Sequence, residues 1–438
     1  MSNVFPRVFG RGLPAVARAE GSVIWDAEGN RFLDAAGGAI VVGIGHGDHA
    51  VVEAMASQAR SVAYAHGTQF TSEGLEAYAA ELAPLLPMAE ARIYPVSGGS
   101  EAMETALKLA RSYHLARGEP ARDKVIARWG SYHGNTLGAL DASGREPLRR
   151  PYDSWLGRAR HVPAPYEYRC PNPSHPEACG AWHADALEEE IQETGPGSVA
   201  CFVAEPVVGA TLGAAVPPDD YWPAIQEVCR RHGILLVVDE VMTGFGRTGR
   251  WFGSDHWQVR PDILVAGKGA SSGYWPLGLT ACSRKIFEAV AEAGFVHGFT
   301  HSHSVVGAAV GRAVLAKLKA GSLVEASREK GERLLKELTA ALADDPHAGD
   351  VRGLGLMVGV ELVGDRETKE PFPRSAKATE RVVAAARDSG LLLYASTGCA
   401  DGTDGDLVML GPPFVITDAE MGEAVDKTRE AIALLGLA

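Results

Sequence analysis

Four polar side chains that could do chemistry each follow a short apolar run of the sequence: Tyr132, Glu205, Asp239 and Lys268. Short, continuous apolar runs are typical of parallel strands that are buried on both faces. The carboxyl ends of such strands meet at one edge of the sheet, where ligands bind. We therefore expect a lysine, two carboxylates and a phenol to lie together at that edge.

An anion site is predicted at the same edge. The segment Ser97-Gly-Gly-Ser100 follows the apolar stretch 94–96 and opens a helical pattern over 101–116. The free N–H groups of Gly99 and Ser100 would lie at the positive end of that helix, which favours a phosphate. No Lys-Ser or Lys-Thr pair follows the glycines, so the segment is not a P-loop.

A phosphate cradle, an aromatic ring, a carboxylate and a lysine are together what pyridoxal 5'-phosphate (PLP) requires. The lysine forms a Schiff base with the cofactor aldehyde. The carboxylate keeps the pyridine nitrogen protonated, so that the ring accepts electrons from the substrate, and the aromatic ring stacks on the cofactor. The sequence therefore predicts a PLP site.

The middle of the chain alternates strand-like and helix-like patterns. The apolar runs cover 124–127, 200–204, 234–238 and 263–266. Helical patterns such as 185–194 and 221–232 lie between them. This alternation predicts an α/β fold with a mostly parallel central sheet flanked by helices.

The two ends of the chain have a different pattern. Residues 23–33 predict a hairpin that turns at Glu28-Gly29-Asn30. An amphipathic helix over 323–342 is followed by further strands and helices. We expect a large cofactor-binding domain over 49–322 and a small, discontinuous α+β domain made from 1–48 and 323–438.

Composition excludes several classes of protein. Hydrophobic residues make up 46% of the 438 residues, which is too many for a disordered chain. The net charge of −13 argues against binding to nucleic acid or to an anionic membrane, which needs basic patches. Six cysteines are too few for a disulfide framework and indicate free thiols in the cytoplasm.

No targeting or membrane segment is visible. Residues 1–12 contain no apolar run of the kind found in secretory signals. No stretch reaches the roughly 18 apolar residues of a membrane span. We expect a cytoplasmic protein.

Five segments of the chain have a distinctive sequence: Ser97-Gly-Gly-Ser-Glu-Ala102, Ser131-Tyr-His-Gly134, Asp239-Glu-Val-Met-Thr-Gly-Phe-Gly-Arg-Thr-Gly249, Pro261-Asp-Ile-Leu-Val-Ala-Gly-Lys-Gly269 and His297-Gly-Phe-Thr300. In these segments the chain resembles the class III PLP-dependent aminotransferases of fold type I, including the omega-aminotransferases. The resemblance runs from about residue 21 to the C-terminus.

The resemblance implies three catalytic residues. Lys268 would form the Schiff base and then move the proton between the substrate and the cofactor. Asp239 would pair with the pyridine nitrogen. Glu205 would lie near the cofactor hydroxyl and the substrate.

The resemblance also implies a set of cofactor-binding residues. Tyr132 would stack on the ring, and Val241 would pack on its opposite face. Gly99 and Ser100 would hold the phosphate, and His133 belongs to the same set through the Ser-Tyr-His-Gly segment.

Thr300 matches a family threonine that reaches the phosphate of the neighbouring subunit. This implies a homodimer with a shared active site, either alone or within a tetramer. Here Thr300 is followed by His-Ser-His-Ser rather than by the Gly-His-Pro or Ala-His-Pro of many members.

Two further departures from the family pattern concern the cofactor and the substrate. Met242 stands where members usually carry a glutamine that contacts the cofactor hydroxyl. Residues 397–413 contain no arginine, although members that bind an α-carboxylate often place one there. We expect an amine or omega-amino acid as donor and a pyruvate-type keto acid as acceptor, in a ping-pong cycle. Arg149 or Arg150 could supply the missing charge.

Three other functions share parts of this pattern. An aminomutase or racemase and a decarboxylating aminotransferase of the same fold begin with the same Schiff base, so the motifs do not separate them from an aminotransferase. A mutase or racemase needs no keto acceptor. A non-catalytic binding protein is disfavoured because Lys268 and Asp239 are both present.

Two weaker patterns are set aside. Gly244-Phe-Gly-Arg-Thr-Gly249 follows an Asp-Glu pair rather than opening a helix, which argues against an NAD-binding loop. No metal site is predicted, because the spacing of the candidate ligands is unusual for zinc and surface or interface loops explain them. Those candidates are Cys170, His175, Cys179, His183, His297, His301 and His303.

Overall fold

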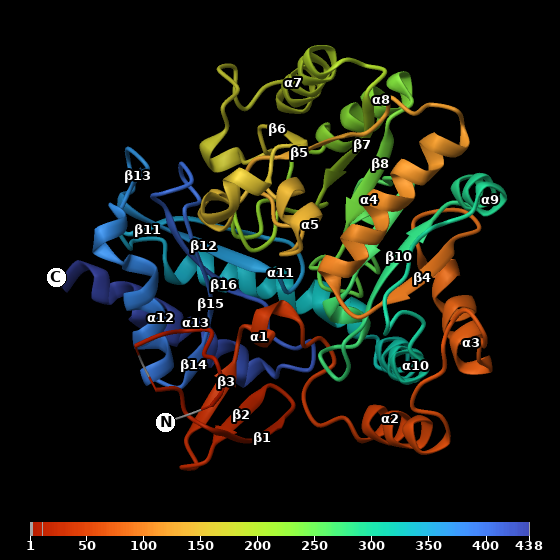
Figure 1. Cartoon of the computed structure of the whole chain (residues 1–438). Helices are drawn as coiled ribbons and strands as arrows, with labels where there is room; N and C mark the ends of the chain where they lie inside the picture. The colour runs from red at the N-terminus through yellow and green to blue at the C-terminus, as the bar shows by residue number, and fades with distance from the viewer. Residues whose placement is uncertain (1–2, 11, 438) are drawn as a thin grey trace.

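A seven-stranded sheet forms the centre of the molecule in the computed structural model, which describes residues 3–10 and 12–437 (Figure 1). Its strands are, in spatial order, β4 (Arg92–Val96), β10 (Gly278–Cys282), β9 (Ile263–Ala266), β8 (Leu235–Asp239), β7 (Val199–Ala204), β5 (Lys124–Arg128) and β6 (Ala159–Val162). Neighbouring strands from β9 to β6 are parallel, and β10 is antiparallel to both β9 and β4. The predicted mostly parallel sheet is confirmed.

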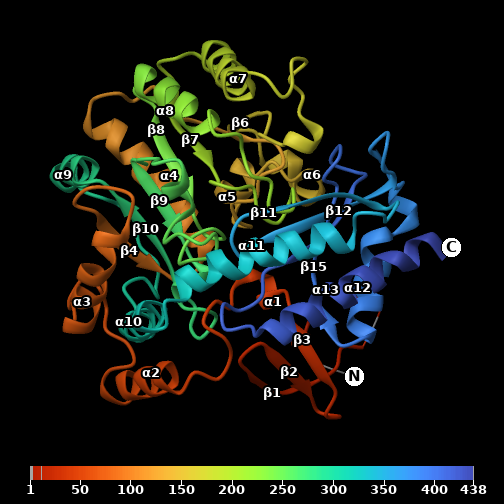
Figure 2. The same cartoon turned by 180° about the vertical axis from the view of Figure 1, so that it is seen from behind.

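Helices cover both faces of this sheet (Figures 1 and 2). Strands β7, β8 and β9 are buried along their whole length, which explains their continuous apolar sequences. One hydrophobic cluster joins the sheet to α4 (Gly99–Ala116) and α9 (Arg284–Ala293). Another joins the sheet to α7 (Cys179–Thr194) and α8 (Tyr221–His232). The carboxyl ends of the parallel strands stay open for a site.

The sequence patterns do not predict β6 and β10. β6 is an edge strand that carries Arg160 and His161 and is only partly buried, so it lacks a continuous apolar run. β10 is buried but contains Thr280, whose hydroxyl donates a hydrogen bond to the carbonyl of Ala102 at 2.7 Å. Both strands depend on neighbours that are distant in the sequence.

The C-terminal part of the chain forms an antiparallel sheet with helices. Its strands are, in spatial order, β11 (Ala348–Gly353), β12 (Val358–Asp365), β16 (Asp406–Leu410) and β15 (Tyr394–Thr397), and β13 (Glu370–Pro371) pairs with β12. Its helices are α11 (Leu323–Ala341), α12 (Ala378–Asp388) and α13 (Asp418–Ala433). Residues 353–362, a stretch punctuated by glycines, form the end of β11, a turn and most of β12, because the glycines at 353 and 355 allow the chain to reverse.

Both ends of the chain share one small sheet. β1 (Val16–Glu20), β2 (Val23–Asp26) and β3 (Arg31–Asp34) form an antiparallel meander, and β14 (Leu391–Leu392) adds parallel to β3. The predicted hairpin over 23–33 is confirmed. The division into domains at 48/49 and 322/323 stays a prediction.

The remaining α-helices lie around these sheets. They are α1 (Gly37–Ile40), α2 (His49–Ser61), α3 (Glu73–Leu82), α5 (Leu137–Ala142), α6 (Glu146–Arg149) and α10 (Val305–Ala320). α10 packs against both α2 and α3, beside the β4 edge of the central sheet (Figure 2).

Arg247 connects the loop after β8 to both ends of the chain. Its guanidinium donates hydrogen bonds to the carbonyls of Leu356 and Pro412, both at 2.8 Å, and to that of Val42 at 3.1 Å. The guanidinium carbon also lies 4.6 Å from the centre of the Phe414 ring. Burial lowers the pKa of Arg247 to about 9. This arginine holds the elements around the site at fixed positions.

Two glycines allow α11 to pack closely on the turn between β11 and β12. A side chain at Gly331, in the middle of α11, would lie 2.1 Å from the backbone of Gly355. Gly355 has a φ of +58° and would itself place a Cβ atom 2.3 Å from the backbone of Thr248. Glycine is therefore required at both positions.

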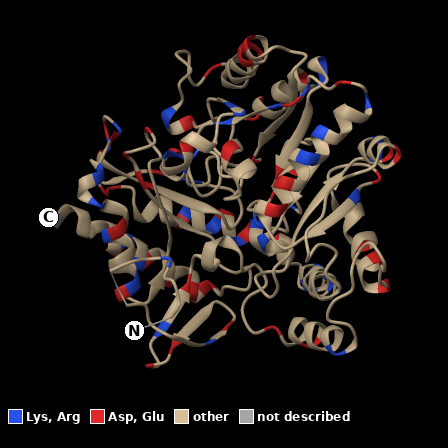
Figure 3. Cartoon of the chain, viewed as in Figure 1, with Lys and Arg blue, Asp and Glu red and all other residues tan. Residues whose placement is uncertain are grey.

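Charged residues of both signs are distributed over the chain (Figure 3). Within residues 3–10 and 12–437, no helix combines the length and the apolar character needed to cross a membrane.

Replacing Gly331 by alanine is expected to destabilise the protein. The new methyl group would have to displace the backbone of Gly355, and such overpacking costs about 1–3 kcal/mol. The thermal unfolding midpoint of Gly331→Ala should therefore fall by several degrees. Gly422 is the matched control, because it also lies inside a helix but a Cβ atom there meets nothing within 4 Å. Gly422→Ala should leave the midpoint unchanged or raise it. Equal midpoints for the two variants would contradict this packing.

Candidate active site

A cavity of about 180 Å³ lies at the carboxyl ends of the parallel strands. It is lined by every predicted site residue except Thr300, together with Gly134, Ala210 and Met242. The strand ends deliver these side chains: Asp239 is the last residue of β8, Glu205 follows β7, and Lys268 follows β9. The topology therefore brings together the residues that the sequence pattern selected.

Asp239 is held from two sides. Its Oδ2 lies 2.7 Å from Nδ1 of His133, and its Oδ1 accepts a hydrogen bond from the N–H of Val241 at 3.0 Å. Both the carboxylate and the imidazole are buried. Nε2 of His133 is buried and has no hydrogen-bond partner in the described structure. These contacts fix the carboxylate in one orientation, so it is preorganised for a ligand in the cavity.

Lys268 has an amine that is easily deprotonated. Burial lowers its pKa to about 8, although the charges of Asp239 and Glu205 act in the opposite direction. Its backbone is also strained, with a φ of +41° in the short helical turn after β9. Strain of this kind is common at functional sites, where the surrounding structure enforces it.

Glu205 is the least satisfied carboxylate of the cavity. Its Oε2 is buried without a hydrogen-bond partner, and the nearest cation is Nη2 of Arg128 at 3.6 Å. Burial raises the pKa of the Glu205 carboxyl. Arg128 was not singled out by the sequence patterns, although it lies at the end of the apolar run that forms β5.

The predicted phosphate cradle is open and rigid. Gly99 and Ser100 are the first residues of α4, so their N–H groups have no acceptor within the helix. The Ser100 hydroxyl accepts a hydrogen bond from the N–H of Asn135 at 3.0 Å. Gly134 has a φ of +141°, and a side chain there would lie 2.6 Å from that hydroxyl. Only glycine keeps this space free.

These groups fit PLP. Free amides at a helix N-terminus suit its phosphate, and the oriented Asp239 carboxylate suits a protonated ring nitrogen. The unpartnered polar atoms of His133 and Glu205 leave hydrogen bonds for a polar ligand to make. Tyr132 and Val241 line the same cavity and offer an aromatic and an apolar surface for a flat ring. The Sδ atom of Met242 packs on Gly209, where a Cβ atom would lie 2.4 Å from it.

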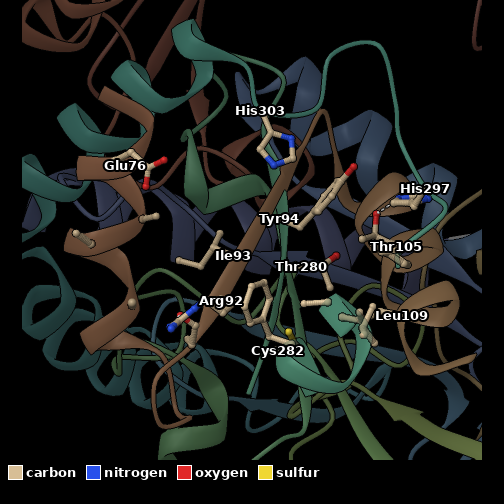
Figure 4. A pocket seen from close by; sticks show the side chains of 18 residues that line it. Glu76, Arg92, Ile93, Tyr94, Thr105, Leu109, Thr280, Cys282, His297 and His303 are labelled. Atoms are coloured by element: carbon tan, nitrogen blue, oxygen red, sulfur yellow. Dashed lines mark hydrogen bonds between the residues drawn. The ribbon is translucent and has the colours of Figure 1, made fainter. Parts of the chain in front are cut away.

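Thr300 lies outside this cavity and is exposed. Its loop borders a larger, mainly apolar cavity of about 650 Å³ between α3, α4 and α9 (Figure 4). His297 on this loop bonds the hydroxyl of Thr105 at 2.9 Å, and the His303 ring packs edge-on against Tyr94. Both histidines are thus engaged within the chain.

The acids before Pro412 are explained by local structure. Asp401 accepts hydrogen bonds from the N–H groups of Thr403 and Asp404, and the Asp406 carboxylate caps the start of α12 through Thr379. None of the three acids at 401, 404 and 406 lines the cavity that contains Lys268. They therefore carry no direct information about the substrate.

Arg149 and Arg150 were predicted as possible sources of the positive charge that residues 397–413 lack, and they differ in whether their guanidinium groups are free to bind a carboxylate. Arg149 donates to the carbonyls of Leu140, Asp141 and Ser143 and is occupied. Arg150 is exposed on the surface. Arg145 is a better candidate, because its buried Nε has no partner in the described structure.

The charge of Arg145 also acts on the cavity wall. Burial and Tyr394 raise the pKa of the Tyr132 hydroxyl, and the charges of Arg145 and Arg7 act against them. Tyr132 lines the cavity, so both arginines lie within electrostatic reach of it.

The family model, the curated relatives and the solved structures that match this chain are all aminotransferases or transaminases. The model of the class III aminotransferase family matches residues 10–432. The chain is 34% identical to the putrescine–pyruvate aminotransferase of Pseudomonas aeruginosa, covering 96% of this chain and 91% of that protein. It is also 34% identical to the diaminobutyrate–2-oxoglutarate transaminase of Halomonas elongata, covering 95% and 89%. A PLP-bound amine transaminase from an uncultivated Pseudomonas species superimposes with a TM-score of 0.92, at 35% identity and with complete coverage of both chains.

The lowered pKa of Lys268 can be measured by reductive alkylation of the cofactor-free protein with a small aldehyde. Labelling of Lys268 should rise with pH to a midpoint near 8, because the neutral amine is the nucleophile. Exposed lysines should titrate near their usual value of about 10.4. In Asp239→Asn the midpoint should move to lower pH, since the carboxylate that favours the ammonium form is gone. Peptide mass spectrometry measures each site, and a Lys268 midpoint equal to that of exposed lysines would contradict the site described.

Proposed function

The chain belongs to the class III aminotransferases, and from that premise we propose that it moves an amino group from an amine or omega-amino acid to a keto acid, with pyruvate favoured. The cycle is ping-pong, with the donor leaving before the acceptor reacts. Class III aminotransferases use PLP.

The observation that carries this proposal is the meeting of Lys268, Asp239 and the Gly99–Ser100 amides in one cavity. PLP, when bound, supplies an aldehyde that amines capture and a ring that withdraws electrons from the substrate carbon. The Lys268 amine would hold the cofactor and, after the substrate amine has taken its place, would move the proton at the substrate carbon. A pKa of about 8 suits both tasks near neutral pH, because either protonation state is accessible.

The other residues of the cavity would bind and orient the cofactor and the substrate. Asp239, fixed by His133 and Val241, would keep the ring nitrogen protonated. The amides of Gly99 and Ser100 would bind the phosphate, and Tyr132 and Val241 would pack on the ring. Glu205 would lie near the substrate, where its unpartnered oxygen would accept a hydrogen bond.

The curated relatives do not share one keto-acid acceptor. The two curated relatives described above are equally identical to this chain, yet one is named for pyruvate and the other for 2-oxoglutarate. Pyruvate is favoured here because it has a single carboxylate, for which Arg145 is the proposed partner. A dicarboxylate would need a second cation, and residues 397–413 offer no arginine.

A panel of amines and omega-amino acids, tested against pyruvate and 2-oxoglutarate, checks this proposal. Transfer to pyruvate should exceed transfer to 2-oxoglutarate. Arg145→Met should raise KM for pyruvate tenfold or more with a smaller effect on the donor half-reaction, since a charged hydrogen bond is worth about 1.5–3 kcal/mol. Lys268→Ala should give no transfer with any pair. A clear preference for 2-oxoglutarate, or unchanged pyruvate kinetics in Arg145→Met, would contradict the assignment.

We further propose that the enzyme is a homodimer, alone or within a tetramer, in which Thr300 completes the phosphate site of the partner subunit. Three observations support this. Thr300 is exposed and does not line its own chain's cavity, Val296 on the same loop is 98% exposed, and Tyr64 packs against His301 beside it. An exposed apolar loop next to a large apolar cavity is suited to burial against another subunit.

Subunit mixing tests the shared site. Lys268→Ala and Thr300→Ala homodimers should each be inactive or impaired. Mixed dimers should regain activity, because one of their two sites would combine Lys268 of one chain with Thr300 of the other, both unchanged. If Thr300 served its own chain, no site in the mixed dimer would be intact. Activity that stays at the level of the separate variants after verified subunit exchange would therefore contradict the proposal.

A cytoplasmic location is proposed on the ground that all six cysteines are unpaired. Fractionation of the source cells should recover the enzyme with a cytoplasmic marker, and recovery in a secreted or periplasmic fraction would contradict this.

A further inference from the structure

The loop between β6 and α7 folds back on itself and brings together two thiols and an imidazole. Cys170, His175 and Cys179 each place one ligand atom within 4.8 Å of the other two. The two Sγ atoms are 3.7 Å apart, and Nδ1 of His175 is 3.3 Å from Sγ of Cys179. We propose that these three side chains bind a zinc ion that fixes the loop.

Two of the three distances between the ligand atoms are close to those of a tetrahedral zinc site, and the third, between Cys170 and His175, is within 4.8 Å. Zinc binds sulfur at about 2.3 Å and imidazole nitrogen at about 2.0–2.1 Å. Tetrahedral angles then place two sulfurs about 3.8 Å apart and a sulfur and a nitrogen about 3.6 Å apart. The Cys170–Cys179 distance agrees closely, and the His175–Cys179 distance needs only a small adjustment. A disulfide would require about 2.05 Å between the sulfurs.

The surroundings of the cluster orient its ligands and allow an ion to enter. Cys179 is buried and is the first residue of α7. Asn172 donates to its Sγ at 3.4 Å and also to the carbonyl of Glu177 at 2.8 Å, which orients the ligand. Cys170 is half-buried and His175 is exposed, so the fourth coordination position faces solvent. A water molecule is the expected fourth ligand.

The position of the loop points to a structural role. None of the three ligands lines the cavity that contains Lys268. The same loop carries Arg169, whose Nε lies 2.7 Å from Oε1 of Glu361, and Tyr166, whose hydroxyl bonds the other carboxylate oxygen. Glu361 is buried in β12. An ion that fixes this loop would therefore fix the contact between the central sheet and the C-terminal sheet.

The spacing of these residues in the sequence did not predict the cluster. Cys170 and Cys179 are separated by eight residues, which does not match the short spacings of common zinc motifs. His183, grouped with them on the basis of sequence, packs instead between Trp182 and Tyr221.

Elemental analysis of the untagged holoenzyme, purified with zinc and then freed of excess metal, tests the proposal. We expect one zinc per chain. Cys170→Ser and Cys179→Ser should each lose it, and His175→Asn should weaken zinc binding at least tenfold. His49→Asn is the matched control, because His49 is also exposed but lies on α2, and this variant should keep one zinc per chain.

Cobalt substitution keeps the test informative if a variant fails to fold. Adding Co²⁺ to the chelator-treated wild-type enzyme should produce a thiolate-to-cobalt charge-transfer band, which blocking the two thiols beforehand should prevent. Wild-type enzyme with no bound zinc and no such band would overturn the proposal. So would a loss of two hydrogens in the intact mass that maps to a Cys170–Cys179 disulfide, or zinc that survives in both serine variants.

Discussion

Lys268 carries its amine into a buried site beside two carboxylates, and the rest of the active site depends on this arrangement. Burial alone would strongly disfavour the ammonium form, and the nearby Asp239 and Glu205 restore part of its stability. The balance leaves a pKa of about 8, which suits the roles of nucleophile, base and acid that we propose for this amine. The left-handed backbone at Lys268 is a further cost of about 1–3 kcal/mol, so the surrounding structure must hold it in place.

That surrounding structure is held by a few specific contacts. Parallel strands β7, β8 and β9 bring Glu205, Asp239 and Lys268 to one edge. Arg247 ties the loop after β8 to carbonyls from both ends of the chain. The contact of Gly331 with Gly355 sets how closely α11 approaches the turn between β11 and β12. A class III aminotransferase thus uses its terminal segments to support the rim of a site built on the central sheet.

The sequence was most informative where one local feature determines the structure. Buried parallel strands need continuous apolar runs, so β7, β8 and β9 and the polar residues after them were predictable. Contacts that depend on how the loops fold were not predictable from the sequence. The Asp239–His133 hydrogen bond, the local capping by Asp401 and Asp406, and the meeting of Cys170 with Cys179 each join residues whose separation in sequence gives no periodic signal. The edge strand β6 was missed for a related reason, since its solvent-facing residues are polar.

The most direct test of the central claim is the stoichiometry of the donor half-reaction. Purified holoenzyme is incubated with an accepted amine donor and no keto acid, and the carbonyl product is counted per active site. A ping-pong aminotransferase should release one equivalent and stop, and should resume only when pyruvate is added. Continued turnover of the donor without any acceptor would contradict the account and would indicate a mutase or racemase.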